Sequence, residues 1–367
     1  MTRKITRWLV TAALTATAGT AFAAPAQAAD HPDTQTVLDQ YLLQAGPGAA
    51  VYAGDGTESW TVASGTSRFG ANRPIEATDH FRIASQTKTF VATTVLRLVD
   101  EGLVDLDAPI ETYLPGVVGG EHYDGNAISV RQLLQHTSGI ARDAINAQAN
   151  PDGTFDLAEL VRAGLAQAPQ FAPGTGYGYS NINYHVLGML IEAITGQPYA
   201  DAVADLVIEP LGLTATSVPA PGDRSLPDPY VHGYQGVRIG SFQFWIETTS
   251  NLEMTYAASA GAMTSTLTDL ATFHSELDTL LSPASLAEMR TTVPGAHNLD
   301  YGLGIMRLNL SCGGEAWGHA GNLTTGHSSV TMVTDDGRYA SMTTNTFPAG
   351  ENAPTRYDVL GTALCEA

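Results

Sequence analysis

The chain has 367 residues, and its 37 Asp and Glu residues outnumber its 17 Lys and Arg residues, which gives a formal net charge of -20 at pH 7. A protein this acidic repels the phosphates of nucleic acids and the headgroups of anionic lipids, so neither is an expected partner. Charged residues make up 15% of the chain and hydrophobic residues 44%, which is typical of a compact folded protein.

The first 29 residues have the pattern of a secretory signal peptide. Arg3, Lys4 and Arg7 precede an apolar stretch over residues 8–22, and Ala26-Gln27-Ala28 follows, with small residues at 26 and 28. We expect cleavage after residue 28 or 29, which leaves residues 30–367 as a single domain. The apolar stretch is too short for a permanent membrane span, and no later stretch approaches that length. The sequence therefore predicts a secreted, extracellular protein without a membrane span.

Strand signals lie at both ends of the mature chain, and a helical stretch lies between them. This order predicts an α+β fold: an antiparallel sheet from the N- and C-terminal segments, flanked by helices, with an inserted and mostly helical lobe. The sheet lobe is expected over 30–104 and 265–367, and the helical lobe over 105–264. The expected helices are 34–44, 85–102, 130–135, 156–167, 183–194, 268–281 and 354–365. The expected strands are 49–53, 60–62, 301–310, 327–334 and 339–345, and the least regular stretch is 219–245.

Once the leader is removed, Lys88 is the one lysine in the chain. It follows Ser85 by three residues, one helical turn away on the same face, so the hydroxyl and the amine can meet. Arginine stays protonated in proteins, whereas a desolvated lysine can lose its proton and act as a base. A chain that avoids lysine could also keep one by chance, so the pair needs support from other motifs.

Two further segments give that support. Tyr179-Ser180-Asn181 follows a glycine-rich turn at residues 173–176, and His319-Ala320-Gly321 precedes a strand. Either segment alone is more often structural, as a loop with a buried tyrosine or as a satisfied histidine. Their order after Ser85 and Lys88 is what indicates a catalytic constellation.

This order and spacing resemble the serine penicillin-recognising enzymes, namely β-lactamases, D-alanyl-D-alanine carboxypeptidases and related esterases. Within that group, the whole mature chain is similar to the secreted serine D-alanyl-D-alanine carboxypeptidase/transpeptidase that is grouped with class C β-lactamases. The other segments that carry the likeness are Phe81-Arg82-Ile83-Ala84-Ser85, Leu98-Val99-Asp100-Glu101-Gly102, Tyr113-Leu114-Pro115-Gly116, His136-Thr137-Ser138-Gly139, Gly188-Met189-Leu190-Ile191-Glu192, Ser259-Ala260-Gly261-Ala262, Tyr301-Gly302-Leu303-Gly304 and Ser311-Cys312-Gly313.

The resemblance implies an acyl-enzyme mechanism. Ser85 would be the nucleophile, and Lys88 would either take its proton or keep the Tyr179 phenol partly ionised, a choice that the resemblance leaves open. Asn181 would hydrogen-bond the lysine and the substrate amide. His319 would face the cleft from the edge of its strand.

The substrate-binding positions follow the family pattern only in part. The oxyanion hole would come from the backbone N–H groups of Ser85 and Asn322. The carboxypeptidase that the chain resembles holds a substrate carboxylate with hydroxyl residues on both sides of the glycine that is Gly321 here, and with an arginine shortly after the Tyr-Gly-Leu-Gly segment. The corresponding residues here are Ala320, Asn322 and Met306. Arg307 follows one place later and would point to the opposite face of its strand. The sequence therefore predicts a weakened or rebuilt carboxylate clamp, which would favour esters, amides or D-amino-acid derivatives.

Competing sites are excluded by their spacing. Residues 326–330 lack the last glycine of a nucleophile elbow, and residues 174–178 lack the lysine of a phosphate loop. His319 and His327 do not have a zinc-binding spacing, so no metal and no cofactor is expected. His136 is interpreted as a turn or packing residue of the helical lobe.

The chain has two cysteines, Cys312 and Cys365. Because export would place them in an oxidising compartment, we predict a disulfide that ties the last helix to a strand and contributes roughly 4 kcal/mol in the loop-entropy model. Two unpaired buried thiols are the alternative.

Together these observations predict a secreted serine hydrolase, with a D-alanyl-D-alanine carboxypeptidase-type peptidase as the preferred activity. An esterase, a D-amino-acid amidase and a class C-like β-lactamase are alternatives of the same fold. A penicillin-binding protein that is acylated without turnover is an alternative of another kind. The expected partner is a small peptide or ester substrate, such as a peptidoglycan stem peptide or a β-lactam, and we expect a monomer.

Overall fold

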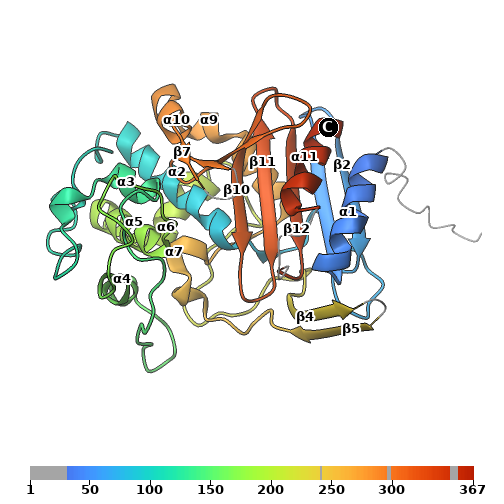
Figure 1. Ribbon diagram of the computed structural model, residues 1–367, viewed down its shortest axis with the longest axis horizontal. Coiled ribbons are helices and arrows are strands. Elements are labelled where there is room, and N and C mark those ends of the chain that lie inside the picture. Colours follow the sequence, from blue (N-terminus) through green and yellow to red (C-terminus); the bar gives the residue numbers. More distant parts are fainter. Residues whose placement is uncertain (1–30, 240–241, 296–298, 348–353) are drawn as a thin grey trace, which may run out of the picture.

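The N- and C-terminal parts of the chain form one eight-stranded antiparallel sheet in the computed structural model, which describes residues 31–239, 242–295, 299–347 and 354–367 (Figure 1). The strand order is β2-β1-β12-β11-β10-β9-β8-β7. The strands are β1 (Gly48–Gly54), β2 (Ser59–Gly65), β7 (Val293–Pro294), β8 (Asp300–Tyr301), β9 (Met306–Asn309), β10 (Glu315–Asn322), β11 (Ser328–Thr334) and β12 (Tyr339–Thr344). The predicted α+β architecture is thereby confirmed. The predicted signal peptide lies outside the described residues.

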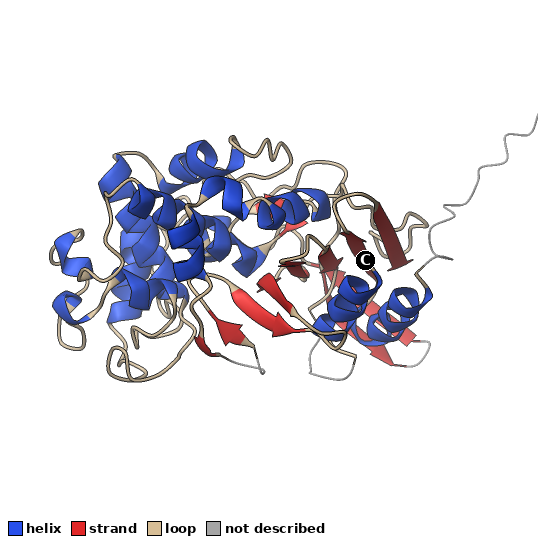
Figure 2. Cartoon of the chain, turned by 90° about the horizontal axis from the view of Figure 1, so that it is seen from above, coloured by secondary structure: helices blue, strands red, loops and turns tan. Residues whose placement is uncertain are grey.

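Helices cover both faces of this sheet. Helices α1 (Pro32–Ala45) and α11 (Arg356–Glu366) pack side by side on one face (Figure 2). Helix α8 (Leu267–Ser275) packs on the other face, against β11 and β12. In α1 the buried positions Leu38, Tyr41, Leu42 and Ala45 recur at helical spacing, so one apolar stripe faces the sheet. The hydrophobic core accordingly has two parts, one on each side of the sheet.

The middle of the chain forms the predicted helical lobe beside the sheet (Figure 2). It contains α3 (Val130–Leu134), α4 (Leu157–Leu165), α5 (Asn181–Thr195), α6 (Tyr199–Val203) and α7 (Ala258–Gly261). Helix α5 begins two residues earlier than predicted because the Ser180 side chain accepts a hydrogen bond from the Asn183 N–H and caps the helix there. It ends at Gly196, whose φ of 72° gives a left-handed C-cap.

Part of the stretch predicted to be irregular is a β-hairpin. Strands β4 (Tyr234–Ile239) and β5 (Phe242–Glu247) pair with each other, and five alternating residues on one face of the pair are exposed apolar side chains. These residues are Val237, Ile239, Phe242, Phe244 and Ile246. The short pair β3 (Phe81–Arg82) and β6 (Thr264–Ser265), which the sequence analysis missed, precedes the Ser85 segment.

Two predicted elements are divided in the structure. The helix expected over 268–281 is split at Glu276 into α8 and α9 (Leu277–Leu280), and α10 (Pro283–Met289) follows it unpredicted. The strand expected over 301–310 is interrupted at Gly304, which has a φ of 71°. A Cβ there would lie 2.4 Å from the Ala92 Cβ, so the backbone can pass α2 (Thr87–Asp100) this closely only with glycine.

Cys312 and Cys365 form the predicted disulfide. Cys365 lies in α11, as expected, but Cys312 lies in the turn between β9 and β10 rather than in a strand. The cross-link therefore ties the last helix to the turn that leads into β10. Within the described residues, none of the helices is both long and apolar enough to cross a lipid bilayer.

Candidate active site

Ser85 and Lys88 meet at the start of α2. Ser85 lies in a short 3-10 turn (Ala84–Gln86) that runs directly into the helix, and Ala84 before it has a φ of 52°, in the left-handed region. Lys88 Nζ is 3.2 Å from Ser85 Oγ. The predicted one-turn spacing thus brings the amine to the hydroxyl.

Two oxygen atoms complete the surroundings of the Lys88 amine. It donates to Asn181 Oδ1 at 2.8 Å, at the start of α5, and to the Ala260 carbonyl at 2.6 Å, in α7. The Asn181 Nδ2 group donates in turn to Asp143 Oδ1 at 2.6 Å, which fixes the orientation of the amide. Lys88 is thus held by three separate segments of the chain.

The Lys88 side chain is fully buried. Burial lowers the pKa of its amine well below the ordinary value of 10.5, while the Asp143 carboxylate opposes this shift and the Arg142 guanidinium adds to it. Among the described residues Lys88 has no direct ion pair, because Asp143 is reached only through Asn181. The structure therefore favours the neutral amine, the form that can accept a proton.

Tyr179 lies beside the same two residues. The Lys88 Nζ is 4.9 Å from the centre of the Tyr179 ring. Burial raises the pKa of the phenol above its ordinary value of 10, and a hydrogen bond with Ser85 opposes that shift. Tyr179 is therefore protonated at neutral pH and can donate a proton.

A cluster of rings supports Tyr179 from behind. The centre of the His136 ring lies 4.2 Å from the centre of the Tyr179 ring. The His136 ring also lies against the rings of Tyr184 and Tyr301. The Ser180 N–H donates to His136 Nδ1 at 3.2 Å. His136 is a packing residue, as the sequence analysis interpreted it, but it packs directly against Tyr179.

His319 does not face the cleft as predicted. Its segment lies inside β10 rather than before a strand, and its ring is fully buried. His319 Nδ1 donates to the Ala320 carbonyl at 2.6 Å, which leaves Nε2 to accept from the Tyr301 hydroxyl at 3.0 Å. Burial and the nearby Lys88 lower the pKa of His319 to about 3. Both ring nitrogens are already engaged, so this histidine joins β10 to the ring cluster and does not offer a free base.

The backbone at the end of β10 suits an oxyanion hole. The Leu323 N–H donates to the carbonyl oxygen of His327, the residue just before β11. Because the backbone donors of antiparallel strands alternate in direction, the N–H of Asn322 points to the opposite edge of β10. That edge is free beside Asn322, since β9 pairs only with residues 315–318. Ser85 and Asn322 both line the same pocket.

Gly321 lets β10 approach the Ser85 segment. A Cβ at this position would lie 2.0 Å from the Ile83 carbonyl oxygen, so a side chain would push the strand away. The glycine thus acts through its backbone.

The other predicted substrate-binding side chains do not line this pocket. Ala320 and Met306 belong to the apolar cluster between the sheet and helices α1 and α11, because both occupy strand positions that face that side. Arg307 points elsewhere and pairs with Asp300 and Glu315, so it is no substitute for the missing arginine.

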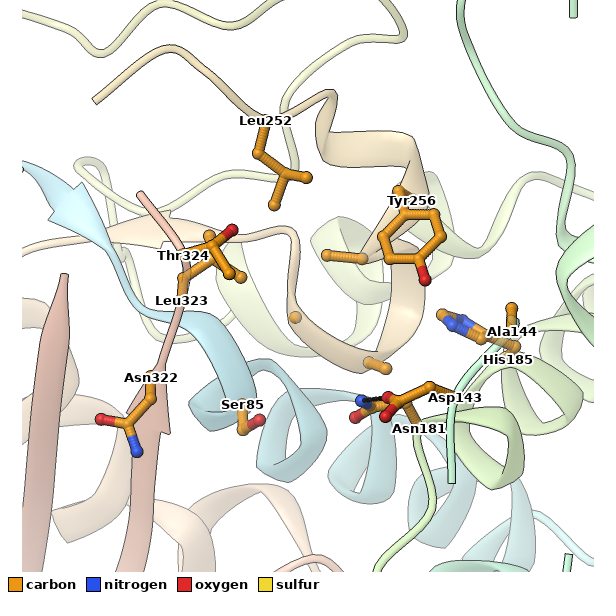
Figure 3. Close-up of a pocket in the computed structure, with 13 residues that line it drawn as sticks. Ser85, Asp143, Ala144, Asn181, His185, Leu252, Tyr256, Asn322, Leu323 and Thr324 are labelled. Atoms are coloured by element: carbon orange, nitrogen blue, oxygen red, sulfur yellow. Dashed lines mark hydrogen bonds between the residues drawn. The ribbon is translucent and has the colours of Figure 1, made fainter. Parts of the chain in front are cut away.

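The Asn322 side chain is also turned away from the pocket (Figure 3). Its Oδ1 accepts hydrogen bonds from Arg356 at 2.5 Å and from Ser328 at 2.8 Å. Arg356 stands at the start of α11 and was missed by the sequence analysis, since nothing in the sequence places this helix beside β10.

The pocket has a volume of about 170 Å³ and holds Ser85 at one side (Figure 3). Its lining includes four residues that the sequence analysis missed, namely Asp143, His185, Leu252 and Tyr256. Only His185 had a sequence signal, because it follows Asn181 by four residues and so shares its helix face. Among the described residues, no group of three or more His, Cys, Asp or Glu side chains is arranged to hold a metal ion.

Comparison with known proteins decides the family. A model of the family described as Beta-lactamase matches residues 34–363. The chain belongs to the β-lactamase family. It has the β-lactamase fold, with the helices and antiparallel sheet described above.

Two relatives of this β-lactamase family protein match part of the chain. It is 40% identical over 178 residues to Esterase EstB of Burkholderia gladioli, covering 45% of each chain. It is 30% identical over 182 residues to Protein flp of Staphylococcus aureus (strain N315), covering 48% of this chain and 36% of that protein. The matched regions thus span less than half the length of these relatives.

Solved structures of the family match over nearly the whole length. A D-stereospecific amidohydrolase from Streptomyces sp. is 38% identical, with a TM-score of 0.80 and coverage of 92% of this chain and 99% of that one. A D-amino acid amidase from Ochrobactrum anthropi SV3 complexed with D-phenylalanine is 26% identical, with a TM-score of 0.79 and coverage of 91% and 98%.

Proposed function

We propose that the protein hydrolyses amides and esters of D-amino acids through an acyl-enzyme on Ser85. The observation that carries the proposal is the contact of the buried Lys88 amine with Ser85 Oγ. The match to a D-stereospecific amidohydrolase over almost the full length of both chains supports the choice of substrate. The sequence analysis preferred a carboxypeptidase and named an esterase and a D-amino-acid amidase as alternatives. The activity proposed here corresponds to those alternatives.

The hydrogen bonds of Lys88 support its role as the base that activates Ser85. A neutral amine has two N–H donors and one lone pair. Asn181 Oδ1 and the Ala260 carbonyl accept the two N–H groups, so the lone pair is left for the Ser85 hydroxyl. Lys88 takes the proton as Ser85 Oγ attacks the substrate carbonyl.

The two backbone donors and Tyr179 serve the following steps. The carbonyl oxygen gains negative charge in the tetrahedral intermediate, and the N–H groups of Ser85 and Asn322 stabilise it. The Tyr179 phenol donates its proton to the departing amine or alcohol and is reprotonated from Lys88. Water then attacks the carbonyl of the acyl-enzyme and gives a proton to Lys88. The bond from that carbonyl to Ser85 Oγ breaks, Ser85 takes the proton back, and the acid is released.

The leaving-group side supports small amides and esters over peptides with a free C-terminus. The positions that hold a carboxylate in relatives carry Ala320, Met306 and an Asn322 side chain bound to Arg356. A substrate carboxylate would meet no free hydroxyl there and would have to compete for the Arg356 guanidinium. An uncharged amide or ester leaving group avoids the free-energy cost of burying a carboxylate that has no free hydrogen-bond donor.

The acyl side of the pocket supports a substrate with a free α-ammonium group. Asp143 is the carboxylate among the residues that line the described pocket, and its side chain is 43% exposed. One of its oxygens is bound to Asn181, next to Lys88, and the other lies 3.5 Å from the Arg142 guanidinium. An ammonium group at this carboxylate would lie close to the reacting carbonyl, as the α-amine of an amino-acid amide does.

A substrate panel tests the proposal. We expect D-phenylalanine amide to be hydrolysed with at least a hundredfold higher kcat/KM than L-phenylalanine amide, and D-alanyl-D-alanine and a cephalosporin to be poor substrates. Ser85→Ala should abolish turnover and labelling by a fluorophosphonate. Preference for the L-amide, or faster release of D-alanine from the dipeptide than of ammonia from the amide, would refute the substrate assignment.

Secretion is part of the proposal. The signal-peptide pattern of residues 1–29 and the Cys312–Cys365 disulfide both support it, because disulfides persist in exported proteins. N-terminal sequencing of protein recovered from the culture medium tests it, with a mature start at residue 29 or 30 as the expected result.

A further inference from the structure

The end of the pocket beyond Asn181 is formed by three polar side chains, Asp143, Tyr256 and His185 (Figure 3). Figure 3 shows the His185 ring with its nitrogen-bearing edge toward the pocket, below the Tyr256 hydroxyl and beside Asp143. The mechanism uses neither His185 nor Tyr256.

His185 is buried without a complete set of partners. Its side chain is 2% exposed, and its Nδ1 has no hydrogen-bond partner among the described residues. Burial lowers its pKa to about 3, so the ring is neutral under physiological conditions and offers one donor and one acceptor. A buried polar atom without a partner destabilises the protein unless something binds it.

The surroundings of His185 fit an aromatic ring with a polar tip. Ala144, Leu252 and Ala257 supply apolar walls in the same pocket. Its volume of about 170 Å³ is close to that of a cavity of roughly 150 Å³ that binds benzene. A phenyl-sized side chain can therefore enter, and any polar atom on it would be desolvated beside His185.

We propose that His185 is a specificity-determining residue, whose imidazole hydrogen-bonds a hydroxyl group on the aromatic side chain of the acyl part of the substrate. This inference rests on the proposed function in one respect, the D-amino-acid substrate class. If both hold, the preferred substrates are derivatives of D-tyrosine rather than of D-phenylalanine. A site with a buried hydrogen-bonding group discriminates against an analogue that leaves the group unpaired.

A matched pair of achiral esters tests the inference independently of D-amide hydrolysis. The pair is p-nitrophenyl 3-(4-hydroxyphenyl)propanoate and p-nitrophenyl 3-phenylpropanoate, which differ only in the hydroxyl. In the wild-type protein we expect the hydroxylated ester to have a kcat/KM roughly tenfold higher, the size of one net hydrogen bond. The ratio should fall to about one in His185→Leu and stay above one in His185→Gln. The matched control Tyr256→Phe removes the neighbouring hydroxyl and should keep the preference.

Each outcome separates the possibilities. A kcat/KM ratio near one in the wild type would mean that only a buried water binds His185, and it would overturn the inference. A ratio that is unchanged in His185→Leu, or lost in Tyr256→Phe, would show that another residue binds the substrate hydroxyl, and it would also overturn the inference. The ratio is measured within one protein preparation, so it does not depend on the yield of folded variant. If the His185 variants do not fold, inhibition of the wild type by 3-(4-hydroxyphenyl)propanamide and 3-phenylpropanamide gives the same comparison. A preserved ester ratio without any D-amide turnover would sink the proposed function and leave this inference standing.

Discussion

The Nζ atom of Lys88 lies 3.2 Å from Ser85 Oγ, although the amine is fully buried and no carboxylate of the described residues pairs with it directly. A permanently charged group in this place would be costly, since its opposite charge is reached only through Asn181. The contact is therefore best suited to a residue that can give up its proton, and the predictions below depend on it.

Lys88→Arg should be nearly inactive even when it is folded. The guanidinium group does not lose its proton in proteins, so it cannot take the proton of Ser85. We expect kcat on a p-nitrophenyl ester to fall by at least about a thousandfold, within the usual range for loss of a general base. Lys88→Met, which fills similar space without a charge, should be equally inactive and at least as stable in thermal unfolding. An arginine variant with substantial turnover would contradict the role of Lys88.

The kcat/KM profile should rise with pH through the lowered pKa of Lys88. Burial favours the neutral amine, and activity is lost as the pH falls and the amine is protonated. The Asp143 charge raises that pKa, so Asp143→Asn should move the acidic limb of the profile to lower pH. A substrate without an amino group, such as p-nitrophenyl acetate, keeps the titration of the substrate out of the measurement. A limb that moves to higher pH in this variant would show that another group controls it.

The protein should lose stability steeply in mild acid because several histidines are buried in the neutral form. Burial lowers the pKa of His185, His274 and His319 to about 3 and that of His327 to about 4. The unfolded chain binds these protons near pH 6.5, so the stability is fully present above that pH and is lost as the pH falls toward the folded-state values. The free energy of unfolding should fall by about 1.4 kcal/mol per pH unit for each histidine. Urea unfolding at pH 7, 6 and 5 measures the slope, and a flat profile would contradict it.

Loss of the Cys312–Cys365 disulfide should lower stability without changing the chemistry of the site. The two cysteines are 53 residues apart in sequence, and closing such a loop stabilises a fold by about 4 kcal/mol in the chain-entropy model. We expect the Cys312→Ser, Cys365→Ser double variant to have a lower urea midpoint and an unchanged kcat on esters at 25 °C. An equal midpoint for the oxidised wild type and the double variant would show that the cross-link adds nothing.

Gly321→Ala should impair catalysis by moving β10. The new methyl group would lie 2.0 Å from the Ile83 carbonyl, so the strand and its Asn322 N–H must shift away from Ser85. Loss of one oxyanion donor lowers kcat by about 10² to 10³, and we expect an effect of this size. Gly361→Ala is the matched control, because a Cβ at Gly361 meets no atom within 4 Å. Equal activity of the two variants would remove the oxyanion role from this strand end.

The sequence predicted the elements whose patterns are local. The spacing of Ser85 and Lys88 required one helical turn, and that turn forms at the start of α2. Strand signals at both chain ends predicted the shared sheet, in which β1 and β12 pair with each other. The hairpin at β4 and β5 was missed because its alternating apolar residues face solvent and contribute to neither core.

The tertiary structure alone decided which polar groups face the pocket. The sequence placed His319 at the cleft, but its partner Tyr301 lies on another strand and turns the ring inward. Met306 and Ala320 face an apolar cluster that α1 and α11 complete. Asp143 reaches the pocket from a loop and Tyr256 from the short 3-10 helix Met254–Tyr256, and no local pattern places either segment at the pocket. Periodicity is fixed by neighbours in sequence, whereas the direction of a side chain and the pKa of its group depend on segments far along the chain that bury it or bind it.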